Sequence, residues 1–172
     1  LADLLTIQDK FGKDKKVSVA FVGDANNVAF SLFEILLKFG HDVRFGGPEK
    51  YFFSKEAQDY LQKLAKDNSG EMLFTSDPIE AVSGVDAVYS DTFVSMGEED
   101  VFDEKMKHFA AFQVNKELFS HTKKEACFMH CLPAHRGIEV TDEIIDSENS
   151  LVYEQSKNRM VVSKGVFAKL LG

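Results

Sequence analysis

Residues 23–28 read Gly-Asp-Ala-Asn-Asn-Val and place two amide side chains directly after a short apolar segment. If a helix begins here, its free backbone N–H groups and its dipole favour an anion such as a carboxylate. Helix capping by one of the two asparagines is the plainer alternative and accounts for one amide. A dinucleotide-binding turn is disfavoured, because it needs glycine where the chain has Ala25 and Val28. The segment therefore indicates an anion-binding turn rather than an NAD site.

A second candidate segment, residues 91–98, reads Asp-Thr-Phe-Val-Ser-Met-Gly-Glu. Asp91 follows a segment typical of a buried strand, so its carboxylate could pair with the ammonium group of a substrate. Ser95 and Gly97 could add a hydroxyl and a backbone N–H, although Ser95 could instead cap a helix that begins at Glu98. A carboxylate and an amide at neighbouring strand ends are what the two charged ends of an amino acid require.

The third candidate segment, residues 130–137, reads His-Cys-Leu-Pro-Ala-His-Arg-Gly. Cys131 beside a histidine is compatible with a nucleophile, a metal ligand or a small buried apolar side chain. A nucleophilic cysteine needs a third group that orients its base, and zinc needs further Cys or His ligands at a recognised spacing. We expect no metal, a buried structural Cys127, and a Pro133 that can adopt a cis peptide bond.

Arg159 belongs to the sequence Lys-Asn-Arg at 157–159, where we expect it to precede or open the last helix. A guanidinium group in that place can bind a phosphate through two parallel hydrogen bonds. The alternative is an ion pair on the protein surface. Arg159 is therefore the candidate for contacting a phosphate-bearing substrate.

Short apolar segments alternate with amphipathic segments along the whole chain. The expected strands are 17–22, 42–45, 71–75, 86–89 and 126–130. The expected helices are 1–11, 28–39, 54–66, 78–82, 98–109, 115–120, 141–145 and 157–171. This alternation predicts an α/β fold, a doubly wound and mostly parallel five-stranded sheet with helices on both faces. A strand order of 3-2-1-4-5 would bring the three candidate segments to one edge of that sheet.

The composition is that of one acidic globular domain. The 172 residues include 20 Lys and Arg against 28 Asp and Glu, a net charge of −8, which argues against nucleic acid or an anionic membrane as the main partner. Two cysteines are too few for a disulfide scaffold, so a cytoplasmic location is expected. The sequence has neither an apolar run of membrane-spanning length nor a signal-peptide pattern. Because it starts at Leu1 inside an amphipathic segment, we expect a piece of a longer protein.

Five motifs resemble, in order, the signature of the second half of ornithine carbamoyltransferase. They are Gly-Asp-x-Asn-Asn-Val at 23–28, Asp91 with Ser-Met-Gly at 95–97, His-Cys-Leu-Pro at 130–133, Glu-Val-Thr-Asp-Glu at 139–143 and Asn-Arg at 158–159. The Ser-Met-Gly motif is similar to that of ornithine rather than aspartate carbamoyltransferases. The resemblance covers residues 1–172 as one ornithine-binding domain and lacks the preceding domain that binds carbamoyl phosphate.

The resemblance implies transfer of a carbamoyl group from carbamoyl phosphate to the side-chain amine of L-ornithine, giving L-citrulline and phosphate in arginine metabolism. It implies no metal or organic cofactor and, for the full-length family, a homotrimer or a higher assembly. We expect the isolated chain to be inactive, because most of the phosphate contacts belong to the missing domain.

The resemblance also assigns substrate contacts to individual positions. The ornithine contacts that it implies are Asn27, Asp91, Ser95 and the backbone of Met96. The groups that it places between the amine and the carbamoyl group are Cys131 and the Leu132 carbonyl. Arg159 is the one arginine that this domain contributes to carbamoyl phosphate, and Asp91, Cys131 and Arg159 are then the catalytic residues.

Some features of the sequence point to further site residues, depart from the family pattern or allow another function. His130 and Arg136 are weaker candidates for the positive groups that stabilise the leaving phosphate. Residues 155–157 read Gln-Ser-Lys where Glu-Ala-Glu is common in the family, which changes the charge near Arg159. The alternative functions are an amino-acid-binding module without chemistry and a carbamoyltransferase that acts on a related amine.

Overall fold

The fold was described from a computed structural model, which covers residues 1–94, 100 and 102–172. Among these residues five strands form one sheet in the order β3-β2-β1-β4-β5, and every neighbouring pair is parallel. The strands are β1 (Ser18–Val22), β2 (Asp42–Gly46), β3 (Met72–Thr75), β4 (Ala87–Ser90) and β5 (Cys127–His130). The predicted fold class and strand order are both confirmed.

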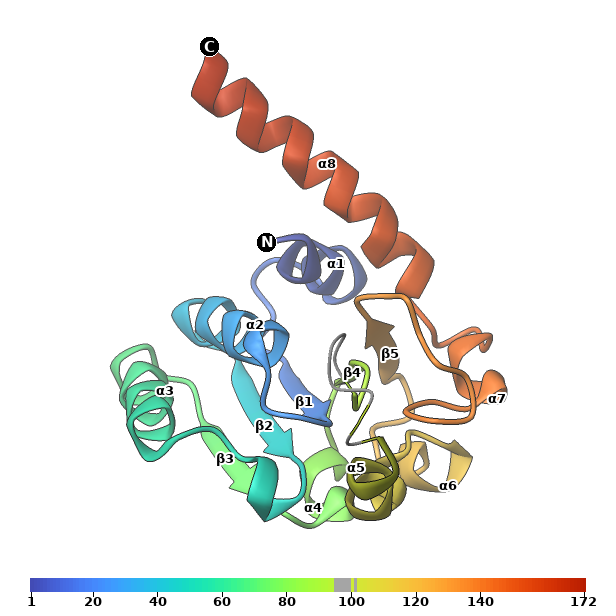
Figure 1. Ribbon diagram of the computed structural model, residues 1–172. Helices are drawn as coiled ribbons and strands as arrows, with labels where there is room; N and C mark the ends of the chain where they lie inside the picture. Colours follow the sequence, from blue (N-terminus) through green and yellow to red (C-terminus); the bar gives the residue numbers. More distant parts are fainter. Residues whose placement is uncertain (95–99, 101) are drawn as a thin grey trace.

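Helices cover both faces of the sheet (Figure 1). The α-helices are α1 (Ala2–Phe11), α2 (Asn27–Lys38), α3 (Lys55–Asp67), α4 (Pro78–Val82), α5 (Phe102–Phe109), α6 (Lys116–Phe119), α7 (Asp142–Ile145) and α8 (Val152–Leu171). One apolar core joins α1, α2 and α3 to the sheet, and a second joins the other face to α4, α5, α6, α7 and the start of α8. The strand interiors are mostly apolar because both faces of the sheet are covered.

Polar side chains set the helix starts that the sequence indicates. Asn26 caps α2 by accepting a hydrogen bond from the Ala29 N–H at 3.0 Å. Ser54 and Asp77 cap α3 and α4 in the same way. The cap on α2 fixes the turn after β1, and this turn carries the first candidate segment.

The last helix differs from the sequence expectation. α8 begins at Val152, five residues before the expected start, so Arg159 lies inside the helix and neither precedes nor opens it. The apolar spacing that predicted this helix begins only at Met160, because the first turns of α8 bury the polar side chains Gln155 and Asn158. Hydrophobic periodicity cannot detect a helix that is anchored by amides.

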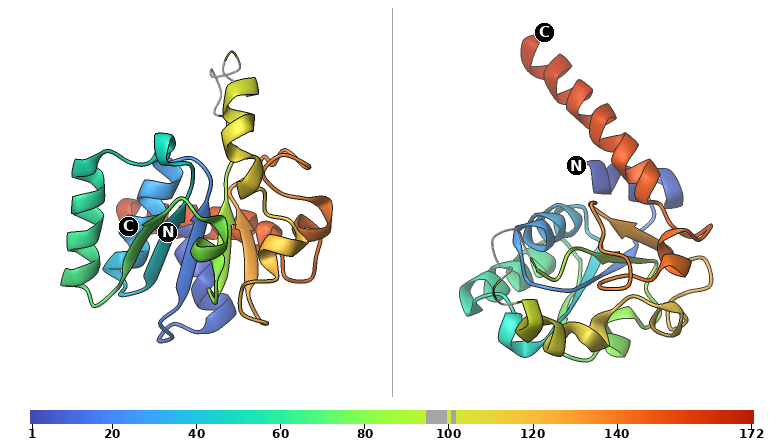
Figure 2. Two further views of the ribbon diagram at one scale, coloured as in Figure 1. Left: turned by 90° about the horizontal axis from the view of Figure 1, so that it is seen from below. Right: turned by 45° about the vertical axis from the view of Figure 1, so that its right-hand side comes forward.

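The second half of α8 extends away from the domain, as Figure 1 and the right-hand view of Figure 2 show. Its exposed apolar residues are Met160, Val161, Val166, Phe167, Leu170 and Leu171. Between this half and α1 lies a mostly apolar groove of about 440 Å³. In the described part of the chain, none of the helices combines the length and the hydropathy that a membrane crossing requires.

Candidate functional site

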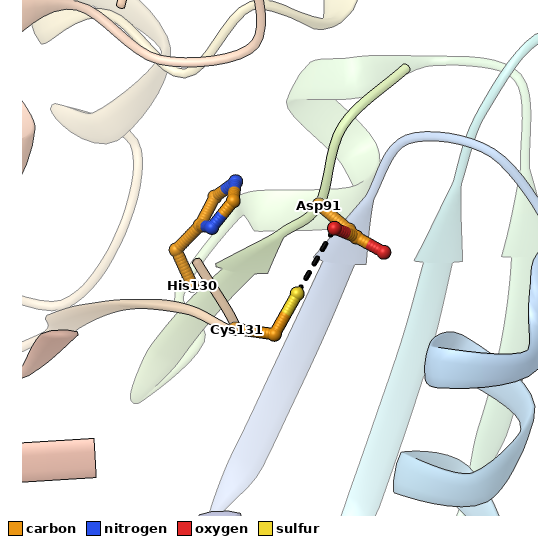
Figure 3. A group of neighbouring side chains, drawn as sticks. All are labelled: Asp91, His130 and Cys131. Atoms are coloured by element: carbon orange, nitrogen blue, oxygen red, sulfur yellow. Dashed lines mark hydrogen bonds between the residues drawn. The ribbon is translucent and has the colours of Figure 1, made fainter. Parts of the chain in front are cut away.

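The three candidate segments meet at the carboxyl edge of the sheet. Val22, Ser90 and His130 lie at the same level in the register of β1, β4 and β5, so the residues that follow them emerge side by side. Asp91 follows β4 and Cys131 follows β5, and the Cys131 sulfur points at the Asp91 carboxylate (Figure 3). The common edge that the sequence predicted is therefore present.

Asp91 is the centre of this arrangement. Its Oδ2 accepts a hydrogen bond from Asn26 Nδ2 at 2.8 Å, and its Oδ1 accepts from the Thr92 N–H at 2.8 Å and from Cys131 Sγ at 2.9 Å. The residue is only 9% exposed. A carboxylate held by three donors has a fixed orientation, so it presents its charge in one place.

The Cys131 thiol is a hydrogen-bond donor to this carboxylate. Burial and then the hydrogen bond and negative charge of Asp91 raise the pKa of Cys131 well above its ordinary value. The sulfur therefore stays protonated at neutral pH, which argues against a thiolate nucleophile. Cys127 is fully buried with a pKa raised to about 12 by burial, in agreement with its predicted structural role.

His130 and Arg136 bind groups of the protein itself, and their expected role toward the leaving phosphate stays a prediction. His130 is buried, with Nδ1 accepting from the Leu132 N–H at 2.9 Å and Nε2 lying 3.2 Å from Glu139 Oε1. Arg136 instead binds Asp142 on α7 at 2.7 Å. Both side chains stabilise the loop after β5, whose Leu132–Pro133 peptide bond is cis as predicted.

A metal-ligand geometry is available at the same place. Ligand atoms of Asp91, His130 and Cys131 lie within 4.8 Å of one another. However, each of these atoms already takes part in a hydrogen bond within the protein, and the sulfur is a protonated donor. The set therefore fits an internal hydrogen-bond network better than an ion site.

A cavity of about 470 Å³ opens beside this network, between α1, α2, α8 and the ends of β4 and β5. Its size suits a small amino acid together with a small second group. Four of the sequence-predicted site residues line it, namely Asn27, Cys131, Leu132 and Arg159. Asp91 is linked to it through Cys131, whereas Ser95 and Met96 lie outside the described residues.

The two asparagines of the first segment have different roles. Asn26 caps α2 and orients Asp91, while Asn27 is the first residue of α2 and lines the cavity. The question of which asparagine caps the helix is thus resolved in favour of Asn26. This leaves the Asn27 amide and the helix N-terminus beside the cavity, where an anionic group is favoured.

Arg159 places a positive charge at the opposite side of Cys131 from Asp91. Its Nη1 lies 3.5 Å from the Cys131 carbonyl oxygen, and the side chain lines the cavity. Cys131 thus touches the carboxylate through its sulfur and the guanidinium through its backbone. Cys131 therefore connects a negative group behind the cavity wall to a positive group that lines the cavity.

Sequence reasoning missed Gln155, Asp3 and Tyr89, which all line the same cavity. The Gln155 amide is 1% exposed and bonds both Asp3 Oδ1 and Tyr89 Oη. Burial, and next the Asp3 charge, raise the pKa of Tyr89 far above its ordinary value, so its hydroxyl stays neutral. The available signal was the four-residue spacing of Gln155 and Arg159, which puts them on one helix face once α8 begins at Val152.

Sequence reasoning also missed a buried ion pair next to the site. Lys105 on α5 is 3% exposed, and its Nζ lies 2.7 Å from Asp24 Oδ2. Asp24 belongs to the turn between β1 and α2, so this pair ties α5 to the segment that carries Asn26 and Asn27. A lysine in an amphipathic helix gives no sequence signal that it will be buried.

Comparisons with known proteins agree with the fold. Residues 15–170 match the family model described as aspartate/ornithine carbamoyltransferase, Asp/Orn binding domain. The ornithine carbamoyltransferase of Pyrococcus horikoshii is 45% identical over 172 residues, which are 100% of this chain and 54% of that protein. That of Bacillus subtilis is 46% identical over 171 residues, 99% of this chain and 54% of that protein.

Solved structures give the same result. The ornithine carbamoyltransferase from Pyrococcus furiosus superposes with a TM-score of 0.92 at 45% identity, covering 97% of this chain and 53% of that chain. The enzyme from Thermus thermophilus superposes with a TM-score of 0.84 at 37% identity, covering 99% and 54%. The chain spans about half the length of the relatives it matches.

Proposed function

Because this chain belongs to the aspartate/ornithine carbamoyltransferase family, we propose that it forms the ornithine-binding half of an ornithine carbamoyltransferase. The complete enzyme transfers the carbamoyl group of carbamoyl phosphate to the side-chain amine of L-ornithine and releases L-citrulline and phosphate, in arginine metabolism. The observation that carries this proposal is the position of Cys131 between the Asp91 carboxylate and the Arg159 guanidinium, at the wall of one cavity.

Asp91 and Asn27 provide for the two charged ends of ornithine. The Asp91 carboxylate attracts an ammonium group, and Asn27 at the start of α2 favours the carboxylate. Ser95 and Met96 complete the ornithine contacts in this proposal. The amine that reacts must be neutral, and removal of water from the filled cavity lowers its pKa toward neutrality.

Bond formation takes place beside Cys131. The neutral amine attacks the carbonyl carbon of carbamoyl phosphate, and the bond from that carbon to the phosphate oxygen breaks. Phosphate leaves with the electron pair and takes up the proton that the amine nitrogen loses. The Cys131 thiol and the Leu132 carbonyl lie between the amine and the carbamoyl group. Arg159 stabilises the negative charge that develops on the phosphate side.

The remaining phosphate contacts belong to a preceding carbamoyl-phosphate domain, which we propose as the partner of this chain. The groove between α1 and α8 supports that partner, because its mostly apolar lining is suited to be covered by another protein surface. The homotrimer or higher assembly of the complete protein is proposed on the resemblance. A cytoplasmic location is supported by the two free cysteines.

The test is to join this chain to a preceding domain that carries the phosphate motifs, and to measure citrulline formation. Asp91→Asn and Cys131→Ala should each lower kcat/KM by about 100-fold, because both remove a group beside the reacting amine. Asp146→Asn is the matched control, since this exposed carboxylate binds Arg136 outside the cavity.

Two outcomes would contradict the proposal. Full activity in both site variants would show that the site is wrongly assigned, and steady citrulline formation by the isolated chain would show that the second domain is not needed. An amino-acid-binding module predicts instead that ornithine binds with the same affinity with and without carbamoyl phosphate, while no citrulline forms.

A further inference from the structure

Gln155 joins three separate elements at the wall of the cavity. Its Oε1 accepts a hydrogen bond from the His130 N–H at 3.0 Å, at the end of β5. Its Nε2 donates to Tyr89 Oη at 3.0 Å, on β4, and to Asp3 Oδ1 at 2.6 Å, on α1. The amide thus uses its acceptor and both of its donor hydrogens, at a position that is 1% exposed.

Gln155 and Arg159 occupy the same face of α8, one helical turn apart. Gln155 fixes the orientation of α8 about its axis, because rotating the helix would break all three hydrogen bonds together. With that rotation fixed, Arg159 lies beside the Cys131 carbonyl oxygen, 3.5 Å from its Nη1. Gln155 accepts its hydrogen bond from His130 and Arg159 contacts the carbonyl of Cys131, so both contacts are made with the end of β5.

Asn158 holds the same turn from another side. It is 6% exposed, and its Nδ2 donates to Thr6 Oγ1 at 3.0 Å and to Asp9 Oδ2 at 3.2 Å on α1. The first turns of α8 are therefore attached by buried amides rather than by apolar packing alone. Buried hydrogen bonds specify one geometry more narrowly than apolar contacts do, because each unmade bond is costly.

From these contacts we infer that Gln155 is a positioning residue for Arg159, which sets the place of the guanidinium at the phosphate side of the cavity. This inference rests on the proposed function, because the role of Arg159 toward carbamoyl phosphate comes from it. Gln155 itself makes no contact with the reacting atoms. A displaced guanidinium weakens the hold on phosphate even when its charge is kept.

The test is a double-mutant cycle on the complete enzyme, with KM for carbamoyl phosphate as the readout. Gln155→Leu keeps the side-chain size and removes the amide, and it should raise this KM by about tenfold. Arg159→Ala should raise it at least as much. In the Arg159→Ala background, Gln155→Leu should change it by less than about twofold, because the residue acts through the missing guanidinium.

Independent, multiplying effects of the two substitutions would overturn the inference, since a merely structural role for Gln155 does not depend on Arg159. Tyr89→Phe is the second variant, for the case in which Gln155→Leu does not fold. It removes one Gln155 partner and should raise the same KM by a smaller factor, again only when Arg159 is present. Unchanged KM in Tyr89→Phe counts against the inference.

The controls separate this inference from the proposed function. Ser156→Ala changes the exposed neighbour in the same turn and should leave KM unaltered. A wild-type enzyme that forms no citrulline refutes the proposed function and this inference with it. An active wild type that is sensitive to Arg159→Ala but insensitive to Gln155→Leu refutes this inference alone.

Discussion

The replacement Gln155→Glu should make the stability of the protein depend on pH. In the wild type, the amide nitrogen of Gln155 donates to Asp3 Oδ1 at 2.6 Å. The substitution puts a carboxyl oxygen in the place of that donor. At low pH the new carboxyl is protonated and donates in the same direction, so little is lost. At high pH two carboxylates face each other.

The magnitude follows from the separation and the partial burial. Two unit charges about 4 Å apart repel by about 4 kcal/mol at an effective dielectric constant of about 20. Asp3 is partly exposed, so we halve this value to about 2 kcal/mol. That repulsion raises the pKa of the introduced carboxyl in the folded state by about 1.5 units above its ordinary value of about 4.3.

The sign follows from linkage. A carboxyl whose pKa is higher in the folded than in the unfolded state stabilises the fold below the unfolded pKa, and this contribution disappears as the pH rises through the folded pKa. The variant should therefore be less stable than the wild type by about 0.5 kcal/mol at pH 4.5 and by about 2 kcal/mol at pH 8.

Thermal unfolding of wild type and variant at both pH values measures this difference. For a chain of this length, about 2 kcal/mol corresponds to a fall of about 4–8 °C in Tm at pH 8, against about 1–2 °C at pH 4.5. Ser156→Glu is the matched control, because it adds a carboxyl to the same turn at an exposed position. An equal fall in Tm at both pH values, or none at pH 8, would refute the reasoning.

Three further changes test other contacts. Lys105→Met should lower the free energy of unfolding by about 3 kcal/mol, because it leaves Asp24 without its buried ion-pair partner. Urea unfolding measures this loss. A loss as small as that of an exposed lysine variant would contradict the prediction. Gly47→Ala should lower the free energy of unfolding by about 1–3 kcal/mol in the same assay, since the new Cβ would lie 2.4 Å from the Gly23 carbonyl oxygen. Unchanged stability would mean that the backbone shifts there at no cost. Asp91→Asn should lower the pKa of the Cys131 thiol, because it removes the carboxylate that accepts the thiol hydrogen bond. The pH profile of Cys131 alkylation by iodoacetamide should therefore move to lower pH. An unmoved profile would argue against the contact.

The sheet could be predicted because its signal is local. Each strand is a short apolar run that is buried on both faces, and the connections between parallel strands limit the possible strand orders. The meeting of Asp91 and Cys131 then follows, since parallel strands bring their carboxyl ends to one edge. Fold, strand order and the central part of the site were therefore accessible from the sequence.

The parts that could not be predicted depend on buried polar groups. Gln155 and Lys105 are polar residues in amphipathic helices, and a sequence pattern assigns such residues to the solvent. Their burial becomes favourable only through partners that are distant in the chain, Asp3 and Tyr89 for Gln155 and Asp24 for Lys105. Hydrophobic periodicity carries no information about such distant partners. For the same reason it predicts a start of α8 that is too late.

A protonated thiol suits position 131 better than a thiolate. A thiolate would put a second negative charge beside Asp91 and, near Arg159, would compete with an anionic ligand for the guanidinium. A neutral thiol orients the carboxylate without adding charge, and its backbone carbonyl remains available to Arg159. The change from the Asp91 carboxylate to the Arg159 guanidinium is then preserved across a single residue. In the proposed function, the diamine and the acyl phosphate are attracted to these opposite charges, so their reacting groups meet between them.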